Sequence, residues 1–442
     1  MKKYDKYKPT GSPWIGEVPE HWDITRLKYT ANKASCCFID GDWIESTDIS
    51  QDGIRYITTG NIGVLKYKEQ GDSYISEETF KRLNCTEVFE GDIIISRLNE
   101  PIGRSCILPN LNCRVVTSVD NVILRPDIDT YNKQFLVYWL NSKRFTENAN
   151  LIARGATMHR ISRNMLGHLS VVVPSLSEQE AIAKYLDEKC GSIDKIIATQ
   201  EKRVALLNEL KQSVISEAVT RGITPDAPIK DTGIEWIGQI PEHWEVKRLR
   251  FVCEFRNGYT PSKANPDFWE DGTIPWYRME DIRDSGRYLN EAKQYVTEEA
   301  VKGAGLFEAG SFILATTATI GEHAMLIVDS LANQQFTNLK IRKSLAQALN
   351  KDFFFYYLYV IDDFCKSSTR TATFPAMNME DLKNFGVTLP PIKEQEKIVE
   401  YLNAKTTSID TLISKANKEI ELLNEYKQLI ISEAVTGKIK VC

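Results

Sequence analysis

Apolar positions recur at alternating spacings of three and four residues over two long segments of the chain, residues 186–218 and 402–434. This spacing, kept over several heptads, is the a/d pattern of a coiled coil. The alternative is an amphipathic helix lying on a globular core. Because both segments keep the same heptad frame, we favour two long helices that pack against each other.

The two segments are copies of one another. An offset of 216 residues (390 − 174) aligns residues 174–220 with 390–436 without a gap, and about half of the aligned positions are identical. A repeat of this length sets the architecture of the whole chain. Both copies carry a lysine on the seam, Lys211 and Lys427. A parallel, in-register pair would bring these charges together, so we expect antiparallel packing and a pseudo-twofold molecule.

Each repeated segment carries signals for where its helices begin and break. Ser177 and Glu180 fit a capping box at the start of the first copy. The pairs at 191–192 (Gly-Ser) and 407–408 (Thr-Ser) are expected to divide each copy into a short and a long helix. The long part, 193–219, would span about 40 Å at about 1.5 Å per residue. That length equals roughly 12 base pairs of duplex at about 3.4 Å each.

The rest of the chain predicts two mixed domains. Short β-branched and aromatic runs, such as 92–96 and 119–124, predict strands. Residues 132–140 and 350–358 each predict a buried helix. The fold class is therefore α+β, with two mixed α/β domains separated by two long antiparallel coiled-coil helices.

A Trp-Ile-Gly-x-x-Pro-Glu-His-Trp motif opens each half, at 14–22 and at 236–244. We interpret it as a structural anchor for the start of each domain and not as a base-stacking element. The order is thus domain, helix, domain, helix. The predicted boundaries are 1–173 and 223–389 for the domains, and 174–222 and 390–442 for the helical regions.

Composition narrows the possible functions. The chain has a formal net charge of −5, and residues 223–391 carry more Asp and Glu than Lys and Arg. Nucleic-acid binding would therefore depend on local basic loops or on a more basic partner. The first residues lack the apolar core of a signal peptide, and the longest apolar run, 353–361, is too short to cross a bilayer. Nine cysteines without a C-x-x-C pair indicate reduced thiols, so we expect a cytoplasmic protein without disulfides or a zinc site.

Patterns that look catalytic are incomplete. Asn-Pro-Asp-Phe at 265–268 differs from the Asn-Pro-Pro-Phe of adenine methyltransferases and has no Gly-rich cofactor loop beside it. Asp284 with Glu291 and Lys293 imitates a nuclease motif that arises often by chance. The Gly-Lys pair at 437–438 lacks the rest of a P-loop. We therefore expect no catalytic residue and no metal ligand in this chain.

The duplicated arrangement resembles the specificity subunit of a Type I restriction-modification system. The paired opening motifs carry this resemblance, together with the Pro-x-x-x-Glu-Gln-Glu helix starts and the Ile-Ser-Glu-Ala-Val-Thr helix ends, and it covers essentially the whole chain. It implies that each mixed domain is a target recognition domain and that the helices are an antiparallel coiled-coil spacer. Such a protein reads a bipartite sequence in double-stranded DNA, with an unread gap whose length follows from the helices.

The same resemblance implies the partners. Two methyltransferase subunits would dock on the helices, and restriction/translocase subunits would complete the assembly. S-adenosylmethionine, ATP and Mg would be bound by those partner subunits, with no cofactor in this chain and no membrane association. Two alternatives stay open: a coiled-coil scaffold or adaptor that binds no DNA, and the detached recognition region of a fused restriction–methylation enzyme.

Sequence readout requires loops whose side chains reach base edges and phosphates. Two loops at matching places, just before the strand that leads into each helix, combine Arg or Lys with small polar residues, although plain solvated turns can have this composition. Weaker candidates follow the strands elsewhere. The predicted DNA-binding residues are Arg154, Thr157, His159, Arg160 and Arg163 in the first loop, Lys366, Ser368, Arg370, Thr371 and Thr373 in the second, then Thr58, Thr59, Asn61, Arg278 and Asp281, and last Arg97, Asn99, Thr316 and Thr317.

Overall fold

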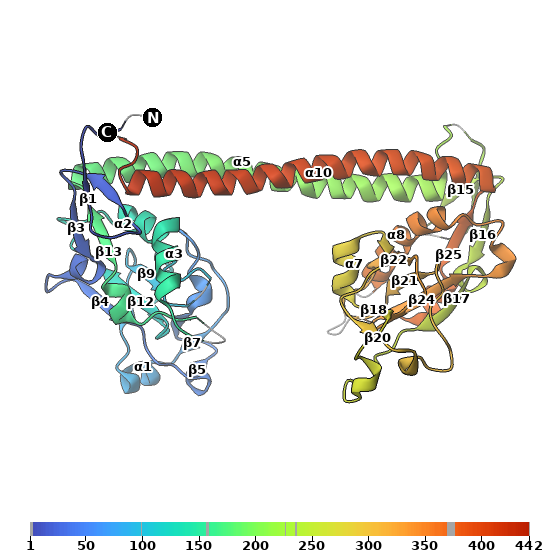
Figure 1. The fold of residues 1–442 in the computed structure, drawn as a ribbon, viewed down its shortest axis with the longest axis horizontal. Helices are drawn as coiled ribbons and strands as arrows, with labels where there is room; N and C mark the ends of the chain where they lie inside the picture. Colours follow the sequence, from blue (N-terminus) through green and yellow to red (C-terminus); the bar gives the residue numbers. More distant parts are fainter. Residues whose placement is uncertain are drawn as a thin grey trace. The chain divides into compact units, whose positions relative to one another are not determined.

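The computed structural model describes residues 3–98, 100–155, 159–225, 227–234, 237–368 and 376–441, without the side chain of Ser368. The chain divides into two compact units (Figure 1). Unit 1 comprises Met1–Glu201 and Asn417–Cys442, and unit 2 comprises Lys202–Ala416. Each unit therefore contains one mixed α/β domain together with a part of each long helix.

The two long helices are α5 (Leu176–Arg221) and α10 (Ile392–Val435), of 46 and 44 residues. The predicted breaks at 191–192 and 407–408 are wrong, because both helices run through these positions without interruption. One internal glycine costs a helix only about 1 kcal/mol relative to alanine, and burial of neighbours such as Cys190 offsets it. At about 1.5 Å per residue, α5 is about 69 Å long, well beyond the expected 40 Å.

In unit 1 the two helices are antiparallel. The Trp22 indole Nε1 donates a hydrogen bond to Glu178 Oε1 near the start of α5, at 3.3 Å. The same ring lies next to Gly437, just past the end of α10, where an added Cβ would be 3.0 Å away. Further along both helices, Lys427 Nζ pairs with Asp194 Oδ1 at 2.5 Å. From the Trp22 contact to the Lys427–Asp194 contact, residue numbers rise along α5 and fall along α10, so the two helices run in opposite directions.

Unit 2 repeats this arrangement with the helices exchanged. The Trp244 ring lies next to Gly222, just past the end of α5, and an added Cβ there would be 3.5 Å from Glu394 near the start of α10. Further along, Lys211 Nζ pairs with Asp410 Oδ1 at 2.8 Å. The antiparallel prediction is confirmed within each unit, and each seam lysine has an aspartate partner.

The domain of unit 1 is built around two sheets, a four-stranded antiparallel sheet and a five-stranded mixed sheet (Figure 1). The four-stranded sheet has the order β10-β9-β12-β4, and the five-stranded sheet has the order β5-β7-β6-β11-β8. The strands are β1 (Tyr7–Pro9), β2 (Glu17–Pro19), β3 (Asp23–Arg26), β4 (Cys37–Asp40), β5 (Ile49–Ser50), β6 (Ile54–Ile57), β7 (Tyr74–Ile75), β8 (Glu87–Val88), β9 (Ile93–Ser96), β10 (Ser105–Ile107), β11 (Val115–Thr117), β12 (Asn121–Arg125) and β13 (Ser170–Val173). The helices are α1 (Glu77–Leu83), α2 (Lys133–Leu140), α3 (Lys143–Ile152) and α4 (Arg163–Gly167), with short 3₁₀ turns η1 (Leu27–Ala31), η2 (Ser46–Asp48) and η3 (Thr59–Asn61).

The domain of unit 2 has the same plan with a larger main sheet, of order β17-β24-β21-β22-β19, and a three-stranded sheet of order β20-β18-β23. The strands are β14 (Ile229–Asp231), β15 (Gln239–Pro241), β16 (Glu245–Arg248), β17 (Cys253–Asn257), β18 (Ile274–Tyr277), β19 (Tyr288–Leu289), β20 (Tyr295–Val296), β21 (Phe312–Ala315), β22 (His323–Leu326), β23 (Leu331–Ala332), β24 (Phe336–Ile341) and β25 (Gly386–Leu389). The helices are α6 (Leu249–Val252), α7 (Met279–Ser285), α8 (Lys351–Ser368) and α9 (Met379–Asn384), with 3₁₀ turns η4 (Pro266–Phe268), η5 (Glu298–Ala300) and η6 (Lys343–Leu345).

A buried glutamine fastens each domain to its helix. Gln179 of α5 accepts a hydrogen bond from the Asn132 amide at 2.9 Å and donates to the carbonyls of Thr130 and Pro174. Both Gln179 and Gln395 are fully buried. These three bonds pair the buried side-chain oxygen and both N–H groups of the glutamine. They explain why a glutamine recurs in the Glu-Gln-Glu at the start of both helices. In unit 2, Gln395 makes the same three bonds with Asn350, Ala348 and Pro390.

The predicted buried helices and strands are present, and the first capping box is shifted. Helices α2 and α8 begin within one residue of the predicted 132–140 and 350–358. At the start of α5, however, Ser175 and Glu178 exchange the capping hydrogen bonds. The expected pair, Ser177 and Glu180, lies inside the helix, because the helix begins earlier than the sequence signal suggested.

Candidate nucleic-acid interface

Three strands of unit 1 bring charged residues to one edge of the sheet, the edge that is formed by the ends of the strands. Because β9, β12 and β4 are antiparallel neighbours, the end of β9, the start of β12 and the end of β4 meet at the same edge. Arg97 follows β9, Asp120 precedes β12 and Asp40 ends β4. The predicted loop joins them, since Ile161 N donates to Arg97 O at 3.1 Å and Arg160 forms a β-bridge with Leu98.

These groups form an ionic cluster, defined as Asp40, Arg97, Asp120, Arg160 and Arg163. Arg160 Nη2 lies 2.8 Å from Asp120 Oδ1, and Asp40 lies 3.3 Å from Arg97 Nε and 3.5 Å from Arg163 Nε. Three arginines face two aspartates, so the cluster is locally basic. The Arg160 and Arg163 side chains are 40% and 43% exposed, and so they are the members that a ligand can reach.

Arg97 supports the edge from inside the domain. Its side chain is 6% exposed, and its Nη2 donates a hydrogen bond to the carbonyl of Val119. Burial lowers the pKa of the Arg97 guanidinium, and the nearby carboxylate of Asp40 opposes that effect. Arg97 therefore holds the β9, β12 and β4 ends together, which leaves little of its side chain for a direct base contact.

At the corresponding edge of unit 2, the described positions at the ends of β17 and β21 and at the start of β24 carry neutral side chains. This edge carries a neutral cluster, defined as Asn257, Thr316, Asn333, Gln335 and Thr337. Thr337 Oγ1 donates to Asn257 Oδ1 at 3.3 Å and lies 3.0 Å from Thr316 Oγ1. Asn333 Nδ2 donates to Gln335 Oε1 at 3.2 Å. Asn257 is exposed at the end of β17.

Two further candidates of the first predicted loop, Arg154 and His159, lie beside the cluster in the chain. Arg154 and Arg160 exchange backbone hydrogen bonds of 3.1 and 2.9 Å, which close the loop that carries His159. Arg154 and His159 are both exposed. Thr157 lies outside the described residues.

The second predicted loop is described only at its start. Lys366 is exposed on α8 and pairs with Asp362 at 2.7 Å, and Ser368 ends that helix. Thr317 next to the neutral cluster forms a β-bridge with Ala376. Arg370, Thr371 and Thr373 of this loop, and Asn99 of unit 1, lie outside the described residues.

Among the candidates after β6 and β18, two have buried side chains. Asn61 accepts a hydrogen bond from the Thr58 amide at 2.9 Å, and Asp281 accepts one from the Arg278 amide at 2.6 Å. Both side chains thus fix a turn from within. Thr58 is exposed, Thr59 and Arg278 are partly exposed, and these three are the members of this group within reach of a ligand.

Sequence reasoning missed the polar partners at both edges. Asp40 and Asp120 in unit 1, and Asn257 and Gln335 in unit 2, were not among the candidates. The sequence offered only a weak signal, since each of them lies at the end of a strand or directly before the start of one. Only the strand register, however, shows that these ends meet.

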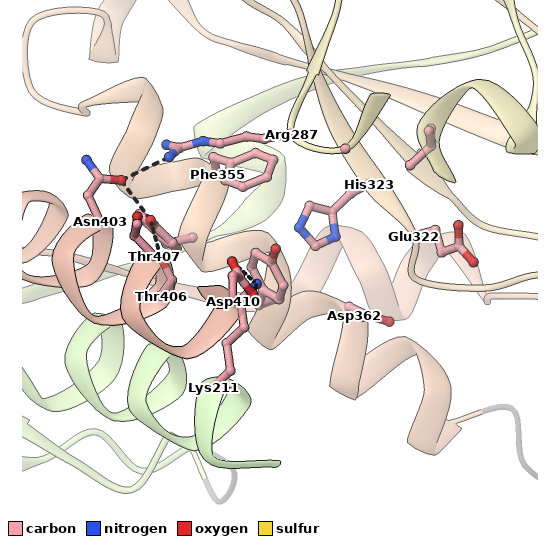
Figure 2. A pocket seen from close by; sticks show the side chains of 14 residues that line it. Lys211, Arg287, Glu322, His323, Phe355, Asp362, Asn403, Thr406, Thr407 and Asp410 are labelled. Carbon is pink, nitrogen blue, oxygen red and sulfur yellow. Dashed lines mark hydrogen bonds and ion pairs between the residues drawn. The ribbon is translucent and has the colours of Figure 1, made fainter. Parts of the chain in front are cut away.

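A cavity of about 520 Å³, lined by charged and aromatic side chains, lies between the domain of unit 2 and the parts of α5 and α10 in that unit (Figure 2). Asn403 Oδ1 accepts hydrogen bonds from Arg287 Nη1 at 3.1 Å and from the Tyr356 hydroxyl at 2.7 Å. His323 packs edge-on against Tyr359, with ring centroids 4.6 Å apart. Burial lowers the pKa of His323 to about 4, so its ring is neutral near pH 7. We interpret this cavity as part of the junction between domain and helices.

Among the residues that the structure describes, no helix is long and apolar enough to cross a membrane. Within the same part of the chain, no group of three or more His, Cys, Asp or Glu side chains could hold a metal ion. Asp284 of the nuclease-like pattern forms an ion pair with Lys293 at 2.5 Å.

Comparison with known proteins gives the family. The model for the Type I restriction modification DNA specificity domain matches twice, over residues 19–207 and 241–422. The chain belongs to this family. Each match covers most of one mixed domain and extends into the long helix that follows it, so this specificity subunit carries the family domain twice.

Individual relatives are also Type I restriction enzyme specificity subunits. The chain is 42% identical over 149 residues to the Type I restriction enzyme EcoprrI specificity subunit of Escherichia coli, covering 34% of this chain and 37% of that protein. It is 25% identical over 449 residues to the Type I restriction enzyme MjaVIII specificity subunit of Methanocaldococcus jannaschii, covering 96% and 94%. A chain in a solved structure described as "Structural basis underlying complex assembly and conformational transition of the type I R-M system" has a TM-score of 0.68 at 17% identity, covering 96% of this chain and 99% of that chain. That structural likeness confirms the α+β fold.

Proposed function

We propose that the chain is the sequence-reading subunit of a Type I restriction-modification complex, in which each domain reads one half-site of a bipartite target in double-stranded DNA. The double family match carries this proposal. The ionic cluster supports it, because it concentrates exposed guanidinium groups in a chain whose net charge is −5. Arginines at a sheet edge can contact both phosphates and base edges.

We further propose that the long helices dock methyltransferase subunits. In unit 1, α3 and α10 border an open groove of about 1180 Å³. Leu422, Tyr426 and Leu429 line it at a spacing of i, i+4 and i+7, and they are 52%, 46% and 52% exposed. Leu151 on α3, 85% exposed, lies on the other side. Such a groove accepts the apolar face of an amphipathic helix, and a helix of the methyltransferase subunit is the occupant we propose.

In this proposal the chemistry resides in the partners. S-adenosylmethionine, ATP and Mg would be bound by the methyltransferase and restriction/translocase subunits, and this chain would supply recognition only. Methylation assays on the isolated chain should then give no product, whereas the assembled complex should methylate DNA. Product formed by the isolated chain would contradict this division of roles.

The experiment that tests the DNA-reading role is methylome sequencing of a host that expresses this chain with its methyltransferase subunits. We expect one modified motif made of two short specific parts with a fixed unread gap between them. A gel shift of the purified complex on random DNA is the second measurement. A complex that assembles but neither modifies nor binds DNA would instead indicate an adaptor.

A further inference from the structure

The two sheet edges can be compared position by position, because the strand register fixes the equivalences. Ser96, the last residue of β9, pairs with Asn121, and Ala315, the last residue of β21, pairs with Phe336. The next residues are therefore equivalent, Arg97 in unit 1 and Thr316 in unit 2. Their amides confirm it, since they donate to the carbonyls of Asp120 at 2.8 Å and Gln335 at 2.9 Å. Asp120 and Gln335 thus occupy equivalent places.

The neighbouring strand and the loop extend the comparison. Val122 pairs with Asp40, and Thr337 pairs with Asn257, which makes Asp40 and Asn257 equivalent. In the loop, Ile161 N donates to Arg97 O and Met377 N donates to Thr316 O. This match gives the last two equivalent pairs, Arg160 with Ala376 and Arg163 with Met379.

Every charged member of the ionic cluster therefore has an uncharged counterpart in unit 2. Both aspartates are replaced by carboxamides, Asn257 and Gln335, and the arginines by threonine, alanine and methionine. The aspartates and the arginines are replaced together. Replacement of the arginines alone would leave two carboxylates at the edge without counter-charges. The two edges thus share their backbone frame and differ in their hydrogen-bonding chemistry.

This difference matters for base recognition. An arginine guanidinium matches the O6 and N7 acceptors of guanine, and an asparagine or glutamine carboxamide matches the N6 donor and N7 acceptor of adenine. Arg160 is exposed and held through Nη2 by Asp120, which reduces the side-chain entropy lost when it binds. Asn257 is exposed and held through Oδ1 by Thr337. In unit 1, Arg160 is held more closely than the other exposed arginine, Arg163, whose Nε lies 3.5 Å from Asp40. Each edge thus presents a tethered, accessible side chain, Arg160 in unit 1 and Asn257 in unit 2.

We propose that the edge of unit 1 reads a G·C base pair through Arg160, and that the edge of unit 2 reads an A·T base pair through Asn257. Asp120 and Thr337 act as positioning residues. This inference rests on the proposed DNA-reading function and adds the class of base pair that each domain selects at this edge.

The test is selection from a random duplex library, at one fixed salt concentration, by the purified complex of the full chain with its methyltransferase subunits. Arg160→Lys keeps the positive charge and the ion pair with Asp120, but it loses the bidentate hydrogen bonding of the guanidinium. We expect its preference at one G·C pair in one half-site to fall roughly 5- to 150-fold, with the other half-site unchanged. Asn257→Ala should produce a fall of the same size at one A·T pair in the opposite half-site.

Arg154→Ala is the matched control, because Arg154 is an exposed arginine of the same loop outside the ionic cluster. It should weaken binding to all sequences alike and leave the selected motif unchanged. Asn257→Asp, which keeps the size of the side chain, repeats the unit 2 test if the alanine variant fails to assemble.

Two results would overturn the inference while leaving the proposed function intact. In the first, the wild-type complex selects a bipartite motif, but Arg160→Lys and the Asn257 variants select the same motif with unchanged preferences. In the second, the affected pairs are of the opposite class. A wild-type complex that selects no motif at all would instead contradict the proposed DNA-reading function.

Discussion

Glu178 shows how single residues connect the opening motif to the helix. Its carboxylate accepts hydrogen bonds from Trp22 at 3.3 Å and from Ser175 at 2.9 Å, and it lies 2.9 Å from His21 Nε2. Burial acts to raise the pKa of Glu178, but the hydrogen bonds from His21, Ser175 and Trp22 outweigh it and hold the pKa below its usual 4.5. The structural interpretation of the opening motif is thus confirmed in unit 1.

This contact makes part of the stability of the chain depend on pH. The folded state binds a proton at Glu178 less readily than the unfolded state, so its contribution is complete above pH 4.5 and is lost as the pH falls through the lower folded-state pKa. We therefore expect Glu178→Gln to be less stable than wild type near pH 7 and the difference to shrink toward pH 3. Urea unfolding followed by circular dichroism measures it, and a difference that is constant with pH would contradict the assignment.

At the scale of elements, the seam between α5 and α10 combines apolar packing with two reciprocal ion pairs. Leu186, Ile193, Leu402 and Ile409 are at most 6% exposed, as the heptad pattern predicts. The pairs Asp194–Lys427 and Asp410–Lys211 are related by the 216-residue offset, one in each unit. A parallel pairing would have brought like charges together, so the ion pairs specify direction.

The pair in unit 1 offers a test by charge exchange. Asp194 pairs with Lys66 at 3.0 Å as well as with Lys427, so Asp194→Lys places three positive charges together where the Lys427 side chain is only 15% exposed. It should lower the free energy of unfolding by about 1–2 kcal/mol. Adding Lys427→Asp should restore part of the loss, because it re-forms the pair across the seam but leaves the new lysine beside Lys66. Chemical denaturation of the two single variants and the double variant gives the coupling, and a double variant no better than Asp194→Lys would count against the pairing.

At the scale of the whole molecule, the duplication and the antiparallel helices could be predicted from the sequence because their signals are local and periodic. The composition of the sheet edges could not be predicted from the sequence. Asp40, Arg97, Asp120 and Arg160 are far apart along the chain, and only strand pairing brings them together. The predicted helix breaks failed for a related reason, since weak local preferences at 191–192 were overridden by packing.

Assembly with partners can be tested in the groove of unit 1. Leu429→Glu puts a charge among exposed apolar side chains, and it should weaken binding of the methyltransferase subunit by about 30-fold, the effect of losing a central interface contact. Ile128→Glu is the control, because Ile128 is 66% exposed in the same unit and does not line the groove. Isothermal titration calorimetry gives both affinities, and equal losses for the two variants would argue against the groove.

The composition of the units has a consequence for biosynthesis. Unit 2 is one continuous stretch of chain, whereas unit 1 needs the segment Asn417–Cys442 as well as its first 201 residues. Ile430, Ile431, Ala434 and Val435 from that segment belong to the same buried core as Trp22 and Leu186. On the ribosome, every residue of the second unit is therefore made before the first can close its core. The domain translated first is the one that must wait for residues 417–442 to leave the exit tunnel.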